Sequence, residues 1–106
     1  MASHPDFVEY VAEQLRQAGN IRSRKMFGEY GLYCDGIFFA VICEDQFFIK
    51  RTPEGENAFP HLPKAPPYKG AKDHILLEDV DDRDTMTALT RITCLALCSR
   101  PAKRRK

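Results

Sequence analysis

The residues that most often carry out chemistry in a small protein, cysteine and histidine, are few and widely spaced in this chain. They are Cys34, Cys43, Cys94 and Cys98, with His4, His61 and His74. A metal site or a catalytic centre needs such side chains at characteristic spacings, or beside a serine, a carboxylate or one another in a motif. These spacings match none of those motifs. The sequence therefore predicts reduced structural thiols, with no catalytic residue, no bound metal and no cofactor.

Two clusters of basic residues offer a second chemistry, the binding of nucleic acid. Arg22, Arg24 and Lys25 form the first cluster, and residues 103–106 form the second. Sixteen basic against fifteen acidic residues leave a formal net charge of +1, so no long-range field would attract DNA or an anionic membrane. A charged edge strand and a solvated tail explain the two clusters without a nucleic acid. Direct nucleic-acid binding is therefore kept as an alternative function.

The middle of the chain must position these residues, and its turn signals predict antiparallel strands. Asp35-Gly36 lies between two apolar runs, which predicts a type I′ hairpin turn pairing residues 31–34 with 37–43. A second reversal at Glu44-Asp45 would pair residues 37–43 with 46–51. Two hairpins that share a strand make a three-stranded antiparallel unit.

Opposed residues share a face of a sheet, so this register predicts two apolar faces. The expected core face holds Tyr33, Phe38, Ala40, Ile42, Phe47 and Ile49. The other face carries a candidate interaction patch of Leu32, Phe39, Val41 and Phe48, with Cys34, Cys43, Gln46 and Lys50 around it. Such a patch is too apolar to be left in water. It should be covered either by another segment of the chain or by a second subunit.

Helical periodicity marks both ends of the chain. Apolar residues recur at three- and four-residue spacing over 7–18 and again over 86–97, which predicts one helix from about Ser3 to Ala18 and another from Asp81 or Asp82 to Ser99. The apolar stripe of each helix needs a sheet face to cover it. The sequence thus predicts an α+β domain, an antiparallel sheet of four to five strands with the terminal helices packed on it.

The remaining segments fill in this plan. Residues 21–27 and 74–78 are expected to be further strands, and the proline-rich stretch 52–73 a loop with a short helical turn. One domain over 1–100 should be followed by a disordered basic tail over 101–106. No apolar run approaches the ~20 residues that span a bilayer, and the start lacks the pattern of a secretion signal. A cytoplasmic protein without membrane contact is expected.

With these elements in place, the segment RKMFGEYGLYCDGIFFAVICEDQFFIKRTPEGENAF resembles the amino-terminal domain of the TfoX/Sxy family. The family pattern has a Met-Phe-Gly start, a glycine-aromatic pair, an Asp-Gly hairpin, a Phe-Ala strand and an aromatic strand ending in lysine. The matching residues are Met26, Phe27, Gly28, Tyr30, Gly31, Tyr33, Asp35, Gly36, Phe39, Ala40, Phe48 and Lys50. Position 29 is glutamate where glycine is frequent in the pattern. The likeness extends over nearly the whole chain.

The resemblance implies a small α+β domain and a role in transcription. Named members of the family regulate natural competence together with a cyclic-AMP-responsive transcription activator, and they carry a second, carboxy-terminal domain that is not expected here. The implied function is a non-enzymatic regulatory or adaptor domain that binds a transcription activator or a polymerase component. The apolar patch on the second sheet face predicts in addition that the chain self-associates as a homodimer. Direct nucleic-acid binding is the first alternative, and a small enzyme is the second.

Overall fold

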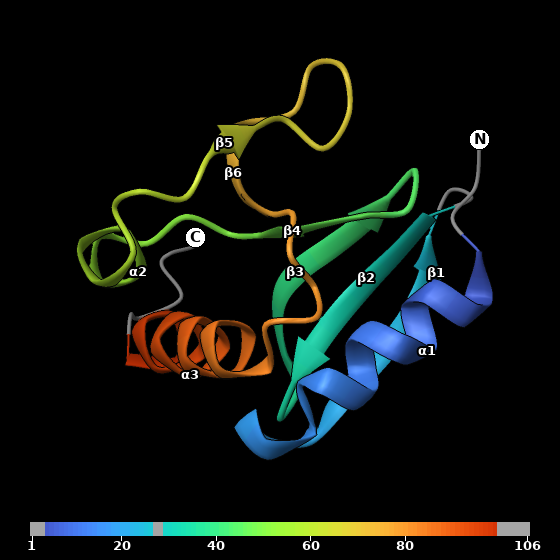
Figure 1. Ribbon diagram of the computed structural model, residues 1–106, viewed down its shortest axis with the longest axis horizontal. Helices are drawn as coiled ribbons and strands as arrows, with labels where there is room; N and C mark the ends of the chain where they lie inside the picture. Colours follow the sequence, from blue (N-terminus) through green and yellow to red (C-terminus); the bar gives the residue numbers. More distant parts are fainter. Residues whose placement is uncertain (1–3, 27–28, 100–106) are drawn as a thin grey trace.

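The computed structural model describes residues 4–26 and 29–99, which form an antiparallel sheet with helices packed on it (Figure 1). In chain order the elements are α1 (Pro5–Gln14), η1 (Arg16–Ala18), β1 (Ile21–Met26), β2 (Glu29–Cys34), β3 (Ile37–Cys43), β4 (Gln46–Ile49), α2 (Pro53–Ala58), β5 (Lys64–Ala65), β6 (His74–Leu77) and α3 (Arg83–Ser99). The predicted α+β fold is confirmed. The sheet has six strands instead of four or five, because β5 in the proline-rich stretch pairs with β6.

The strand order is β1-β2-β3-β4-β6-β5, and every neighbouring pair is antiparallel. Both predicted hairpin turns have two residues. Asp35 and Gly36 take φ angles of 52° and 85°, and Glu44 and Asp45 take 52° and 58°. These left-handed angles are what a type I′ turn requires at both central positions. The pairs expected from two-residue turns are all present, namely Tyr33 with Phe38, Ile42 with Phe47, and Ala40 with Ile49.

The predicted division into two faces is wrong for one hairpin, because β3 contains a bulge. Leu32 pairs with Ala40 whereas its neighbour Tyr33 pairs with Phe38, so Phe39 is an extra residue without a partner on β2. An extra residue reverses the side-chain alternation on either side of it. Tyr33 and Phe38 therefore leave the expected core face.

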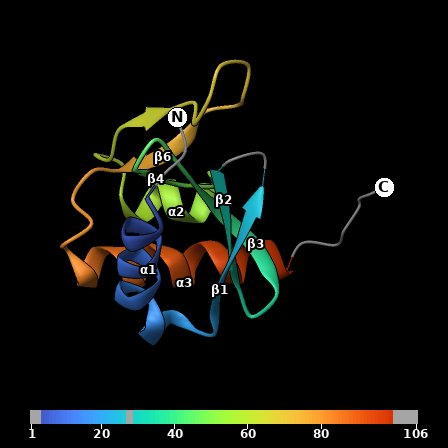
Figure 2. The ribbon, with the colours of Figure 1, turned by 90° about the vertical axis from the view of Figure 1, so that its right-hand side faces the viewer.

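The residues that replace them belong to the core that α1 and α3 cover. Leu32 and Phe39 are both 0% exposed, and Cys34 is buried with them. Phe47 lies in the core, as predicted, and Phe39, which was expected on the other face, lies there too. The buried core consists of Val8, Val11, Leu15, Leu32, Cys34, Phe39, Ala40, Ile42, Phe47, Ile49, Ile75, Leu77, Met86, Leu89 and Cys94. Figure 2 shows α1 lying beside β1 and β2 and crossing α3.

Polar contacts fix the two terminal helices to each other. The buried Gln14 side chain donates from Nε2 to the Val80 carbonyl at 2.9 Å and accepts from Arg83 Nε at 3.0 Å. Asp82 caps α3 by accepting from the Thr85 amide and hydroxyl, which lowers the pKa of its carboxyl group. Helix α1 begins at Pro5 after His4. The expected cap Ser3 and the expected tail 101–106 lie outside the described residues.

Candidate functional site

The face of the sheet opposite α1 and α3, called the open face below, carries the side chains that alternate with the core. Register places Tyr33 opposite Phe38, Val41 opposite Phe48, and Lys50 two residues beyond Phe48 on the same side. Phe48 is only 2% exposed and Cys43 only 5%, although neither belongs to the core cluster. Something on the open face must therefore cover them.

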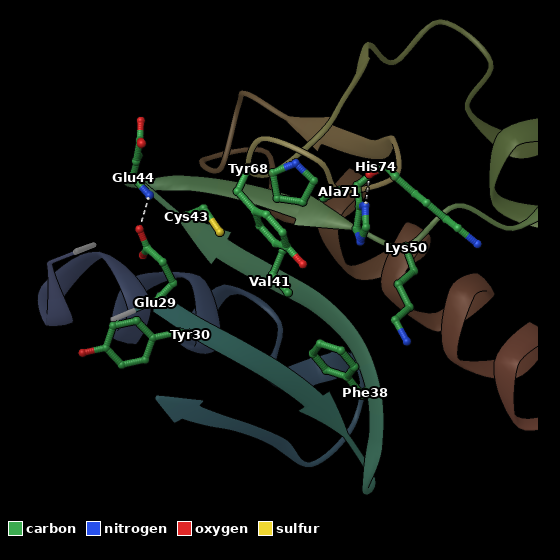
Figure 3. Close-up of a pocket in the computed structure, with 12 residues that line it drawn as sticks. Glu29, Tyr30, Phe38, Val41, Cys43, Glu44, Lys50, Tyr68, Ala71 and His74 are labelled. Carbon is green, nitrogen blue, oxygen red and sulfur yellow. Dashed lines mark hydrogen bonds between the residues drawn. The ribbon is translucent and has the colours of Figure 1, made fainter. Parts of the chain in front are cut away.

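The loop 66–73, which joins β5 to β6, lies over Val41 and Cys43 of this face and borders a cavity of about 650 Å³ between itself and the strands (Figure 3). The cavity is lined by Glu29, Tyr30, Phe38, Val41, Cys43, Glu44, Lys50, Pro67, Tyr68, Ala71, Lys72 and His74. The second face was expected to be covered either by another segment of the chain or by a second subunit. The structure shows a segment of the same chain in this place. Pro67 is buried, whereas the next residue, Tyr68, is 63% exposed.

One end of the cavity is cationic and aromatic. Lys50 Nζ lies 4.4 Å from the centroid of the Phe38 ring, and that ring packs against Tyr33 with centroids 5.2 Å apart. Burial disfavours the charged ammonium, which lowers the pKa of Lys50. Among residues 4–26 and 29–99 no carboxylate forms an ion pair with Lys50. The ring face of Phe38 is the attractive contact that the ammonium makes inside the protein.

The other end of the cavity is acidic, since Figure 3 shows Glu29 and Glu44 far from Lys50 and Phe38. The Glu44 amide donates to Glu29 Oε2 at 3.1 Å, which ties the β3–β4 turn to the start of β2. These carboxylates lie near Cys43, and burial together with their charge raises the pKa of the Cys43 thiol to about 11. At neutral pH this thiol is protonated and is a weak nucleophile.

Among the described residues, the cysteine and histidine that line this cavity are not joined into a catalytic pair. His74 Nδ1 donates to the Lys72 carbonyl at 2.9 Å, and in the described part of the chain no hydrogen bond joins His74 to Cys43. No group of three or more metal-ligating side chains occurs within the described ranges. In the same residues, no helix is long and apolar enough to cross a bilayer. What the cavity offers is an apolar lining with a cation at one end and two carboxylates at the other.

The first basic cluster lies on the edge strand β1, where Arg22, Arg24 and Lys25 are all exposed. Arg22 pairs with Tyr33 and Arg24 with Gly31, so these two arginines lie on the open-face side and Lys25 on the other. The structure thus brings two of the three cations beside the Tyr33–Phe38 pair. The second basic cluster, 103–106, lies outside the described residues.

The candidate patch and the residues of the family pattern divide between the two faces. The expectation that Leu32, Phe39, Val41 and Phe48 form one exposed patch is wrong, because the bulge buries Leu32 and Phe39 in the core. Val41 and Phe48 do lie on the open face. Of the family pattern, Tyr33, Phe48 and Lys50 lie there, Ala40 is in the core with Phe39, and Phe27 and Gly28 lie outside the described residues.

Sequence reasoning found Lys50 as the polar end of a strand and as part of the family pattern, but it did not join Lys50 with Tyr68 and His74 in one site. Lys50 alternates with Phe48 along the chain, which is a signal for a shared face. Tyr68 carries no such signal, because its position depends on the path of the loop 66–73. His74 joins the site because β6 pairs with β4.

Comparison with known proteins agrees with this fold. The TfoX N-terminal domain family matches residues 13–95, which is most of the chain. An uncharacterised 12.7 kDa protein in the trpE 5′ region of Spirochaeta aurantia is 32% identical over 98 residues, covering 92% of this chain and 85% of that protein. The matched region runs from α1 through all six strands into α3. The chain belongs to the TfoX N-terminal domain family.

Proposed function

We propose that this chain is a non-enzymatic regulatory or adaptor domain of the cytoplasm that acts in transcription by binding another protein. Family membership supports the connection to transcription regulation. The observation that carries the proposal is the strip along β1 and β2 where the exposed Arg22 and Arg24 lie beside the half-buried Tyr33. Arginine and tyrosine are enriched in protein interfaces and in their energetic hot spots. A transcription activator or polymerase component with an acidic surface is the partner that suits this strip.

The test is affinity capture from a lysate of the native host, comparing the wild type with Arg22→Ser/Arg24→Ser. A matched control is Arg16→Ser/Lys69→Ser, which removes the same charge from exposed positions away from the strip. We expect a component of the transcription apparatus to be retained by the wild type and the control and lost by the strip variant. Equal retention by all three proteins, or no such component in any of them, would refute the proposal.

Binding of single-stranded nucleic acid is the second candidate, favoured by one observation. Arg22, Arg24 and Lys50 surround the Tyr33–Phe38 aromatic pair on an open sheet face. Cations and aromatic rings on one surface are what proteins use to bind single strands. Fluorescence anisotropy with labelled single-stranded and duplex DNA at physiological salt tests it. Sub-micromolar binding that the strip variant loses would put this function first.

A further inference from the structure

The cavity under the loop 66–73 has the dimensions and lining of a small-molecule site. Its volume of about 650 Å³ falls inside the range of roughly 300–1,000 Å³ typical of ligand pockets. Its middle is apolar, formed by Val41 on β3 and by Pro67, Tyr68 and Ala71 of the loop. We propose that this cavity binds a small organic anion, a flat apolar body that carries one carboxylate or phosphate group. This proposal is independent of the partner protein proposed above.

The negative charge of the proposed ligand is inferred from the surroundings of Lys50. Its ammonium is partly withdrawn from water, and among the described residues it contacts the Phe38 ring without a carboxylate partner. A desolvated cation without a counter-charge is costly for the protein. An anion bound beside Nζ would supply that charge and restore the solvation that burial removes.

The orientation of the ligand is inferred from the acidic end of the cavity, which Glu29 and Glu44 form. Glu44 precedes β4 and Lys50 follows it, so about five residues at ~3.3 Å each separate the turn from the cation. The Glu29 carboxylate is held toward the turn by the Glu44 amide. An anionic group is repelled from this end and attracted to the other. The geometry therefore points the anionic group of the ligand toward Lys50.

The apolar body of the ligand fits between the strands and the loop. Figure 3 shows the Tyr68 ring standing over Val41 between the acidic and cationic ends. Tyr68 is 63% exposed as a residue, so a flat ligand that binds beneath its ring would bury apolar surface of both. His74 adds a polar atom, because its Nδ1 is engaged by the Lys72 carbonyl and Nε2 remains for a hydroxyl or amide of the ligand.

The experiment uses the full chain and the fluorescent probe anilinonaphthalenesulfonate, an aromatic anion. Three competitors share one naphthalene body: naphthoate, naphthyl phosphate and the uncharged naphthylmethanol. We expect the probe to saturate a single site. At least one of the two anions should displace the probe at roughly tenfold lower concentration than the alcohol, as a charge-assisted contact predicts. The stronger of the two anions identifies the group that the site prefers.

Two variants test the role of Lys50. Lys50→Met keeps an unbranched side chain of nearly the same length and should abolish the advantage of the anions over the alcohol. Lys69→Met removes a charge from the same loop outside the cavity lining and should leave the advantage intact. The ratio is measured within each protein, so a modest loss of stability does not affect it; thermal unfolding confirms that each variant is folded.

Three results would overturn the proposal. The first is no saturable probe binding, and the second is an anion advantage that survives in Lys50→Met. The third is displacement of the probe by a short oligothymidylate as effectively as by the naphthalene anions, which would make the cavity part of a strand-binding surface.

Discussion

The one-residue bulge in β3 decides on which face of the sheet two adjacent phenylalanines, Phe38 and Phe39, lie. Phe38 lies half-buried on the open face beneath Lys50, and Phe39 is fully buried between the sheet and the helices. Without the bulge, the alternation of β3 would place Phe38 with Ala40 in the core. Both residues are aromatic, so their types did not distinguish the two arrangements. The bulge decides which ring belongs to the core and which to the cavity.

Alanine substitutions at these two positions measure that difference. Phe39→Ala should reduce the free energy of unfolding by about 3–5 kcal/mol, because it empties a fully enclosed site. Phe38→Ala should cost about 1 kcal/mol, since a half-buried ring loses less apolar burial. Urea unfolding of the two variants, followed by circular dichroism, makes the comparison. The reverse order of the two losses would contradict the bulge.

The four cysteines differ in solvent accessibility, and a thiol reagent can measure this difference. Cys98 is exposed, whereas Cys34, Cys43 and Cys94 are buried and unpaired. Burial raises the pKa of Cys34 and Cys94 and takes that of Cys43 to about 11, so at pH 8 these three thiols remain protonated. Ellman titration at pH 8 should find one fast thiol in the native protein and four after denaturation. A second fast thiol, or fewer than four in total, would refute this assignment.

At the scale of elements, the β3–β4 turn is more strained than the β2–β3 turn, whose second residue is a glycine. Glu44 and Asp45 both have positive φ, a conformation that costs about 1–2 kcal/mol for a residue other than glycine, asparagine or aspartate. Contacts from both sides hold the turn in place. The Glu44 amide donates to Glu29, and Asp45 accepts from the His4 amide at 2.8 Å and from His4 Nδ1 at 2.6 Å, which lowers the pKa of the Asp45 carboxyl.

Replacing the strained glutamate should therefore stabilise the protein. Glu44→Asn keeps the backbone amide that donates a hydrogen bond to the Glu29 carboxylate. It also introduces a residue that enters the left-handed region readily. We expect the free energy of unfolding to rise by about 1 kcal/mol. Gln46→Asn is the matched control, because it makes a similar change at an exposed strand position and should bring no gain. A lower melting temperature for Glu44→Asn than for the wild type would show that the turn carries no such strain.

The elements themselves were largely predictable because their signals are local. The Asp35-Gly36 turn, the pairing of Ala40 with Ile49 and the helical stripes at both ends each depend on residues close in sequence. The bulge, the two-residue strand β5 and the path of the loop 66–73 depend on contacts between distant segments. The cavity is made by that loop and that bulge together, so its residues could not be assembled from the sequence.

At the scale of the whole molecule, one face of the sheet is sealed by α1 and α3 and the other is partly covered by the loop 66–73. The expected homodimer depended on a patch of Leu32, Phe39, Val41 and Phe48. Leu32, Phe39 and Phe48 are buried within one copy of the chain, which leaves only Val41 of the four partly accessible. A twofold interface needs an exposed, self-complementary surface. The four residues that suggested self-association therefore do not form such an exposed surface.

We accordingly expect the chain to be a monomer at low micromolar concentration. A stable interface buries roughly 800 Å² on each partner. Within residues 4–25 and 29–98, the large apolar residues that are exposed are Tyr10, Tyr68 and Leu95. They lie on α1, the loop 66–73 and α3, so they are spread over three separate elements. Sedimentation velocity over a tenfold range of concentration should give one species of the monomer mass, 12.1 kDa. A dimer would contradict this expectation, and Tyr68→Ser and Leu95→Ser would then locate its interface. Loss of the dimer with Tyr68→Ser alone would place a second chain over the cavity, whereas loss with Leu95→Ser would place it on the outer side of α3.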